Sequence, residues 1–312
     1  MDFNFAKQIN SDELITKNFD LFVMATSHEE RYDYLLKNFD LTYSRLAVLS
    51  YDKNDNCNLD NDSGNCTFYS LGDSKYVDVV IDLLDNELSF MTENDNLNIL
   101  VDYSCMTKTW YYTIMSYFIS RDVSYQNIKV FFSYTPSEYV PPQNPQYNAV
   151  IEPIPGRFRM PNVDKPKALL VGLGYESKKA EGIIEYLDPK ITYALYSKPT
   201  LDPRFYEAIE NSNKDLLTRL KNNTLTFPVD DLLMIERILT SLYFSLNDDY
   251  SIVVAPLGPK PFTFVSMLMS LKYEDIDVWR VHSASDFNRY SRKPLITNDL
   301  IICEVDYSAE IK

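Results

Sequence analysis

The feature that most constrains the fold of this chain is a repeated alternation of short apolar runs with longer amphipathic stretches. The short runs are rich in β-branched and aromatic residues, which is typical of buried strands, whereas the longer stretches carry apolar residues at helical spacing. In the first half we predict strands at 20–26, 44–51, 98–104 and 128–134 and helices at 28–39, 74–88 and 108–120. Strands that alternate with helices predict a parallel sheet covered by helices, which is an α/β fold.

The same order of elements returns in the second half of the chain. There we predict strands at 167–173, 191–197, 251–257 and 277–283 and helices at 176–187, 232–246 and 262–271. Segment 23–39 matches segment 171–187, and segment 98–118 matches segment 251–271. We infer an internal duplication with a period of about 150 residues, which is too long for a solenoid repeat. Each copy is therefore expected to be a Rossmann-like domain, a mostly parallel sheet flanked by helices.

The composition changes at 136–166, where prolines are too frequent for a long helix or a central strand. We expect a first Rossmann-like domain over 1–140, a proline-rich linker over 141–165 and a second Rossmann-like domain over 166–312. The second domain carries an extra helical insertion near 199–222, and the run LIICEVDY near the C-terminus predicts an edge strand. Arg157 and Arg159 lie on the linker, where they either close over an anion or are solvated.

Charge and cysteine usage exclude several classes of function. The chain has 30 Lys and Arg against 45 Asp and Glu, a formal net charge of −15, so it lacks the cationic surface of a general DNA- or RNA-binding protein. Four cysteines without a Cys-x-x-Cys pair and only two histidines give no zinc pattern. We expect no metal and no cofactor. The absence of a signal peptide or a membrane-length apolar run predicts a cytoplasmic protein with reduced thiols and no membrane contact.

Ligands of open parallel sheets bind beyond the carboxyl ends of the strands, so polar residues that directly follow strands are the candidate ligand-binding residues. The first set follows the strand at 20–26 and consists of Ser27, His28, Glu29 and Arg31. The N-terminal N–H groups of the helix predicted at 28–39 can meet an anion there. The simpler interpretation is a capping box formed by Ser27 and Glu30.

The corresponding turn of the second copy supplies the candidates Gly174, Tyr175 and Glu176. Glu176 and Lys178 repeat the acid and base that Glu29 and Arg31 provide in the first copy. That repetition favours a role for this turn beyond capping. The run Gly-Leu-Gly lacks the third glycine of the dinucleotide-binding fingerprint, so the sequence does not favour a Rossmann cofactor.

The strongest signal in the chain is the run 101–108, where an apolar strand ends in Asp102 and Ser104 and the next helix begins with Thr107 and Lys108. These side chains can orient a ribose or an amide and meet a phosphate together with the helix N-terminus. The alternative is a plain helix cap beside a surface lysine.

The duplicate of that loop contains Gly258 and Lys260. Gly258 permits a close backbone approach and Lys260 keeps a cation, but Ala255 and Leu257 stand where the first copy has its carboxylate and hydroxyl. A purely structural turn remains the alternative. The runs 133–139 and 282–285 follow the last strands of the two copies, and their role is left open.

The run Asp102 to Lys108 resembles the [D/N]-x-[S/T]-x-x-x-[R/K] motif that follows the fourth strand of CRISPR-associated Rossmann-fold (CARF) sensor domains. The resemblance covers this one motif and a compatible strand order, with the second polar loop at 27–31. It implies a nucleotide sensor of a prokaryotic antiviral system, with a ligand such as a cyclic oligoadenylate bound between two copies of the domain. The second copy departs from the motif at Ala255 and Leu257.

Three functions follow from these observations. The leading hypothesis is a sensing module for a small anionic nucleotide-type ligand, acting with a protein partner or effector encoded elsewhere. The second is a phosphodiesterase or nucleotide hydrolase in the same place, in which Lys108 or Lys260 stabilises phosphoryl charge and Asp102 or Glu29 orients the attacking group. The third is a non-catalytic scaffold that docks onto a partner subunit. No catalytic residue is assigned, and whether the chain is an enzyme stays open.

Overall fold

The computed structural model describes residues 2–51, 65–72, 74–91, 96–120, 127–141, 148–155, 164–283, 291–295 and 300–308. The chain divides into two compact units, and each is described by itself. Unit 1 consists of Met1–Glu138 together with Arg289–Lys312, and unit 2 consists of Tyr139–Asn288. The two-domain α/β fold predicted from the sequence is present in the structure.

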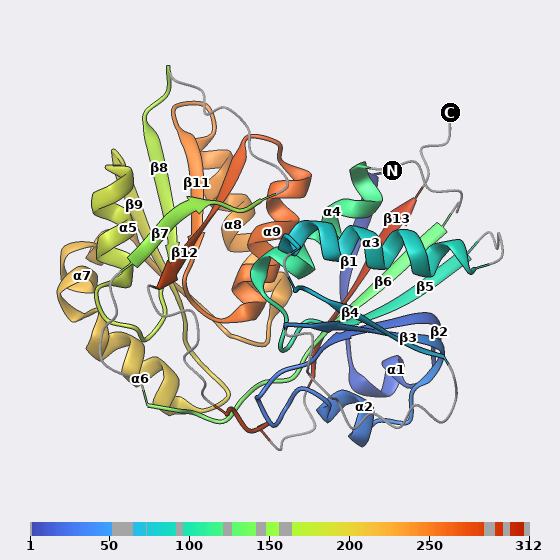
Figure 1. Ribbon diagram of the computed structural model, residues 1–312. Helices are drawn as coiled ribbons and strands as arrows, with labels where there is room; N and C mark the ends of the chain where they lie inside the picture. Colours follow the sequence, from blue (N-terminus) through green and yellow to red (C-terminus); the bar gives the residue numbers. More distant parts are fainter. Residues whose placement is uncertain are drawn as a thin grey trace. The chain divides into compact units, whose positions relative to one another are not determined.

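The described residues of unit 1 form a seven-stranded sheet in the order β1-β13-β6-β5-β2-β3-β4 (Figure 1). Its strands are β1 (Asp2–Ile9), β2 (Asn18–Ala25), β3 (Thr42–Ser50), β4 (Cys66–Ser70), β5 (Asn96–Asp102), β6 (Asn127–Tyr134) and β13 (Ile301–Ser308). The strands from β6 to β4 are parallel, whereas β13 pairs antiparallel with β6 and β1 pairs antiparallel with β13.

Helices cover both faces of this sheet, namely α1 (Ser11–Leu14), α2 (Tyr34–Asn38), α3 (Tyr76–Ser89) and α4 (Lys108–Ser120). On one face Leu14 of α1 and Leu35 of α2 pack in one apolar cluster with Phe22 of β2. On the other face α3 and α4 pack against each other, and α3 contacts β3 and β4. Nine of the thirteen residues of α4 are buried, and apolar side chains accordingly occupy most of its circumference.

The described residues of unit 2 form a six-stranded sheet in the order β10-β9-β8-β11-β12-β7. Its strands are β7 (Asn148–Pro153), β8 (Lys167–Gly172), β9 (Ile191–Ser197), β10 (Thr224–Phe227), β11 (Ser251–Pro256) and β12 (Ile276–Ser283). All neighbours are parallel except β7, which pairs antiparallel with β12.

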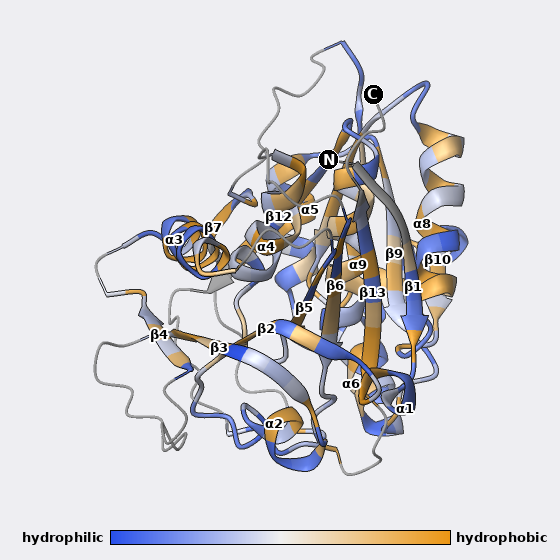
Figure 2. Ribbon diagram, turned by 90° about the vertical axis from the view of Figure 1, so that its right-hand side faces the viewer, coloured by the Kyte–Doolittle hydropathy of each residue, from blue (hydrophilic) through white to orange (hydrophobic). Residues whose placement is uncertain are grey.

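The helices of unit 2 are α5 (Lys179–Leu187), α6 (Pro203–Ser212), α7 (Lys214–Arg219), α8 (Leu232–Leu246) and α9 (Lys260–Lys272), with the short 3-10 helix η1 at Lys221–Asn223. One face of the sheet packs against Ile183 of α5, Ile209 of α6 and Leu216 of α7 in a single apolar core. The helices α8 and α9 pack together and contact β11. Figure 2 shows apolar and polar residues alternating along α8, as expected for a helix with one buried face.

The two units share a strand order. If the five successive parallel strands of each unit are counted along the chain, both sheets read third-second-first-fourth-fifth, followed by an antiparallel strand beside the fifth. This is the order of a doubly wound α/β sheet, in which connections leave the first and fourth strands toward opposite faces. The ancestry of the two halves by duplication stays a prediction from the sequence.

The domain boundaries differ from those expected. The C-terminal strand β13 is an internal strand of unit 1, between β1 and β6, and not an edge of the second domain. The segment 141–165 contains β7, which completes the sheet of unit 2, so it is not only a linker. The insertion expected near 199–222 is confirmed and forms α6 and α7. No helix in the part of the chain that the structure describes is long and apolar enough to cross a membrane.

Candidate functional site

The candidate site of unit 1 lies where its strand order reverses. The neighbouring strands β2 and β5 are the first and fourth parallel strands, and the chain leaves both at the same edge of the sheet. The two loops that follow them, 26–31 and 103–107, are here called the switch-point loops. Doubly wound sheets bind their ligands at this position. Both loops were predicted from the sequence as candidate sites.

The first switch-point loop does not start a helix. The helix predicted at 28–39 is confined to Tyr34–Asn38, so the capping box of Ser27 and Glu30 and the helix N-terminus expected beside it are absent. The Ser27 hydroxyl instead accepts a hydrogen bond from the Glu29 backbone N–H at 3.2 Å, which shapes a local turn. His28 is exposed and Ser27 is half-buried.

Arg31 holds this loop in place from inside the protein. It is 1% exposed, and its Nε donates to Glu29 Oε2 at 2.6 Å while Nη1 donates to the backbone carbonyl oxygen of Thr135 at 2.8 Å. Burial alone lowers the pKa of Arg31, but Tyr134 and Glu29 raise it above its ordinary value, so the guanidinium keeps its charge. Glu29 and Arg31, the acid and the base that the sequence singled out, therefore form an ion pair with each other.

The second switch-point loop is tied to Thr135, the residue that also accepts a hydrogen bond from Arg31. Asp102 Oδ1 accepts a hydrogen bond from the Ser104 backbone N–H at 2.9 Å, and the Ser104 hydroxyl accepts one from the Thr135 backbone N–H at 2.8 Å. Asp102 and Ser104 are 3% and 0% exposed. Both side chains are buried, and their hydrogen bonds hold the loop in shape. Thr135 thus accepts a hydrogen bond from Arg31 on its carbonyl oxygen and donates one from its N–H group to the Ser104 hydroxyl.

The start of α4 stays accessible at the surface. The Thr107 hydroxyl accepts a hydrogen bond from the Trp110 backbone N–H at 3.4 Å, which is the helix cap that the sequence predicts. Thr107 and Lys108 are half-buried, and Lys108 is the first residue of a 13-residue helix. This end of α4 combines the Lys108 side chain with the positive end of the helix dipole.

Two buried hydroxyl groups beside these loops were not among the candidate residues. Ser133 Oγ and Thr135 Oγ1 are buried and have no hydrogen-bond partner in the part of the chain that the structure describes. Ser133 lies opposite Asp102 in the pairing of β5 with β6. Both residues lie in the run 133–139, whose role the sequence left open. Their position at the end of β6 is a local signal, but the partners of Thr135 are too distant in sequence to be read from a local motif.

The two equivalent loops of unit 2 pack directly on each other. A Cβ atom added to Gly174 would lie 2.6 Å from the carbonyl oxygen of Leu257, and one added to Gly258 would lie 2.7 Å from that of Leu173. Both glycines are therefore needed for contact between the loops. The close backbone approach expected at Gly258 is therefore made by the neighbouring loop. It gives no support to a ligand at this position.

The other candidates of unit 2 also have structural partners. Glu176 forms an ion pair with Lys179 and not with Lys178, which is exposed and has a left-handed backbone conformation with φ of 64°. The Tyr175 ring lies 6.3 Å from that of Tyr139 and 5.9 Å from that of Phe205. Lys260 is the half-buried first residue of α9.

The described residues contain no cluster of three or more histidine, cysteine or acidic side chains that would suit a metal ion. Arg157 and Arg159 lie outside the described residues, as do the side chains of the run 282–285. Comparison with known proteins gives no further guidance, because neither a family model nor a curated protein matches this chain.

Proposed function

We propose that this protein binds a small anionic nucleotide-type ligand at the switch-point loops of unit 1. The observation that carries the proposal is the meeting of two polar loops at the point where the strand order reverses, with Thr135 joining them. Loops at this position are the ligand sites of doubly wound sheets.

The buried part of this arrangement would fix the loops before a ligand arrives. Arg31, Asp102 and Ser104 are held by hydrogen bonds of 2.6 to 2.9 Å and are screened from solvent. A preorganised site loses less conformational freedom on binding, which favours affinity. These three residues are therefore proposed as supports and not as ligand contacts.

The accessible part would make the contacts. Ser27 and His28 offer a hydroxyl and an imidazole, while Lys108 and the first turn of α4 offer positive charge. A phosphate is the anion best matched to a helix N-terminus beside a lysine. The buried hydroxyls Ser133 Oγ and Thr135 Oγ1 would gain partners through water or a polar ligand atom.

The motif-level resemblance to CARF domains extends the proposal to a biological role. On that basis the protein would be a cytoplasmic sensing module of a prokaryotic antiviral system, and a nucleotide, for example a cyclic oligoadenylate, would be its signal. The response would pass to a protein partner or effector encoded elsewhere.

The test is thermal unfolding of the full chain with AMP, cyclic AMP and linear and cyclic oligoadenylates. A ligand at about 100 times its Kd adds about 2.7 kcal/mol to the free energy of unfolding, which raises the midpoint measurably. We expect one member of this panel to raise it and Lys108→Gln to remove most of the rise.

The matched control is Lys260→Gln, which changes the corresponding lysine at the start of α9. Because the loops of unit 2 pack on each other, this variant should respond to the ligand as the wild type does. The proposal fails if no nucleotide raises the midpoint, or if Lys260→Gln removes the response and Lys108→Gln keeps it. Product analysis of the same mixtures tests the hydrolase alternative.

A further inference from the structure

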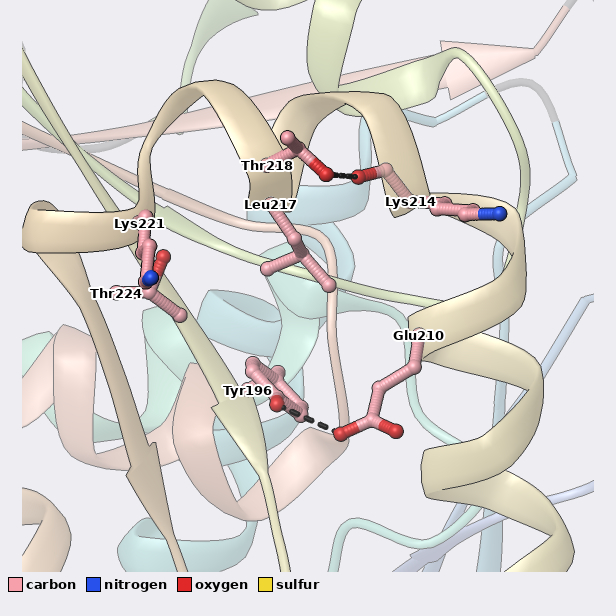
Figure 3. A pocket seen from close by; sticks show the side chains of 7 residues that line it. All are labelled: Tyr196, Glu210, Lys214, Leu217, Thr218, Lys221 and Thr224. Atoms are coloured by element: carbon pink, nitrogen blue, oxygen red, sulfur yellow. Dashed lines mark hydrogen bonds between the residues drawn. The ribbon is translucent and has the colours of Figure 1, made fainter.

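A second place with the features of a ligand site lies in unit 2, in the segment between β9 and β10. An open groove of about 440 Å³ is formed there by α6, α7 and the two strands. Tyr196 and Leu217 form its apolar surface, and in Figure 3 the Leu217 side chain points from α7 toward the Tyr196 ring. A volume of this size accommodates a small organic molecule.

The charge of the groove is positive although the chain as a whole is acidic. Among the described residues, Glu210 is the one acidic residue that lines it. Its Oε1 already accepts hydrogen bonds from Tyr196 Oη at 2.8 Å and from Lys198 Nζ at 2.6 Å. Lys214 and Lys221 also line the groove, and their ammonium groups have no ion pair or hydrogen bond with any described residue. Within the part of the chain that the structure describes, these two lysines are therefore uncompensated, although the formal net charge of the chain is −15.

The hydroxyl groups in the groove already donate their protons within the chain. Thr218 Oγ1 donates to the carbonyl oxygen of Lys214 at 2.8 Å, and Thr224 Oγ1 donates to that of Leu220 at 2.9 Å. Among the described lining residues, the side-chain donors left for a bound molecule are thus the ammonium groups of Lys214 and Lys221. Point charges of this kind attract an anion, and the apolar surface between them favours an apolar body.

We propose that this groove binds a small organic anion, a phosphate ester or carboxylate with an apolar body. The charge of the ligand is held by Lys221 and by Lys214, whose exposed side chain points away from Leu217 in Figure 3 and would turn toward the ligand on binding. The body of the ligand lies against Leu217 and the ring of Tyr196. The proposal is independent of the nucleotide site of unit 1, since it rests on other residues of another unit.

The experiment is a titration of the full chain with phenyl phosphate, followed by NMR of the leucine methyl groups. Leu217→Met identifies the Leu217 signals by their loss. We expect these signals to shift and to approach saturation by about 10 mM phenyl phosphate, because a weak site has a Kd of about 1 mM. The variant Lys214→Gln/Lys221→Gln should raise the Kd by about fivefold, the effect of losing about 1 kcal/mol of exposed charge interactions.

Two controls make the outcome decisive. Lys190→Gln changes an exposed lysine elsewhere in unit 2 and should leave the Kd unchanged. Inorganic phosphate should not saturate the Leu217 signals over the same range, because it lacks an apolar body. The proposal is overturned if phenyl phosphate gives no saturable shift, if the double variant binds as well as the wild type, or if inorganic phosphate binds equally well.

Discussion

Arg31 shows how a residue with the right chemistry for a ligand can serve the fold instead. Its side chain runs from the loop after β2 to the residue after β6, and β5 lies between these two strands in the sheet. An arginine suits this position because its planar group can donate to a carboxylate and a carbonyl at once. The carboxylate is Glu29 and the carbonyl belongs to Thr135.

Replacing Arg31 by methionine should therefore destabilise unit 1. The variant leaves the Glu29 carboxylate and the Thr135 carbonyl without their donor, and losing one partner of a buried pair costs about 3 kcal/mol. Urea unfolding measures the loss. The control is Lys37→Met, whose ion pair with Asp33 involves a lysine that is 68% exposed, so that its loss should stay below about 1 kcal/mol. Equal losses in the two variants would contradict this account of Arg31.

The paired glycines of unit 2 allow a second prediction at this scale. Gly174→Ala and Gly258→Ala each place a methyl group within 2.7 Å of a backbone carbonyl oxygen, so the loops must separate at a cost of about 1–3 kcal/mol. Gly182→Ala, inside α5, should instead be neutral or stabilising by up to about 1 kcal/mol because alanine favours helix. Calorimetric midpoints compare the three. If Gly174→Ala melts like the wild type, the loops do not require the glycine.

At the scale of single residues the sequence predicts position better than role. The spacing of Asp102, Ser104, Thr107 and Lys108 correctly placed them at a strand end and a helix start. It did not reveal that Ser104 binds Thr135, because the two residues are 31 positions apart. Arg31 is 104 positions from Thr135. Such contacts depend on the strand order, which no local pattern contains.

Among the elements, long periodic segments were predicted most accurately. The bounds of α4, α8 and β9 agree with the sequence prediction at both ends. The strands β4, β7 and β10 were missed. β7 lies within the proline-rich run 136–166, and β4 and β10 are edge strands of mostly half-buried residues without a continuous apolar run. β1 was missed as well, and it depends on β13 from the other end of the chain for its pairing.

The buried position of β13 makes a prediction about its cysteine. Cys303 is 4% exposed, and burial raises the pKa of its thiol to about 12. Only the thiolate reacts with alkylating reagents, so at pH 8 Cys66 of the edge strand β4 should be labelled well before Cys303. Because the pKa of this thiol is higher in the folded protein than in the unfolded chain, the free energy of unfolding should fall as the pH rises from about 9 toward 12. Mass spectrometry of a labelling time course gives both rates, and equal rates at pH 8 would argue against an internal β13.

At the scale of the whole molecule, the chain builds unit 1 from both of its ends. The C-terminal segment Arg289–Lys312 returns to unit 1 after the chain has completed unit 2. A sequence read from left to right suggests two consecutive domains, because duplication and the proline-rich run both mark the middle of the chain. The pairing of β13 with β6 instead places the C-terminal strand in unit 1.

Two fragments test this organisation. The fragment 139–288 contains every strand of the unit 2 sheet and should unfold in one cooperative transition. The fragment 166–312 lacks β7 and carries β13 without its partners, so it should be less stable or aggregate through the exposed strand. Circular dichroism during urea unfolding compares them. A fragment 166–312 as stable as 139–288 would show that the sequence-based boundary was the better one.

The central claim is that a nucleotide-type anion binds the switch-point loops of unit 1, and hydrogen exchange of the full chain tests it most directly. With a saturating nucleotide from the panel above, we expect slower amide exchange in 26–31 and 103–109 and unchanged exchange in 173–178 and 257–260. Unchanged exchange in the first two segments with every nucleotide, or protection confined to the loops of unit 2, would contradict the account.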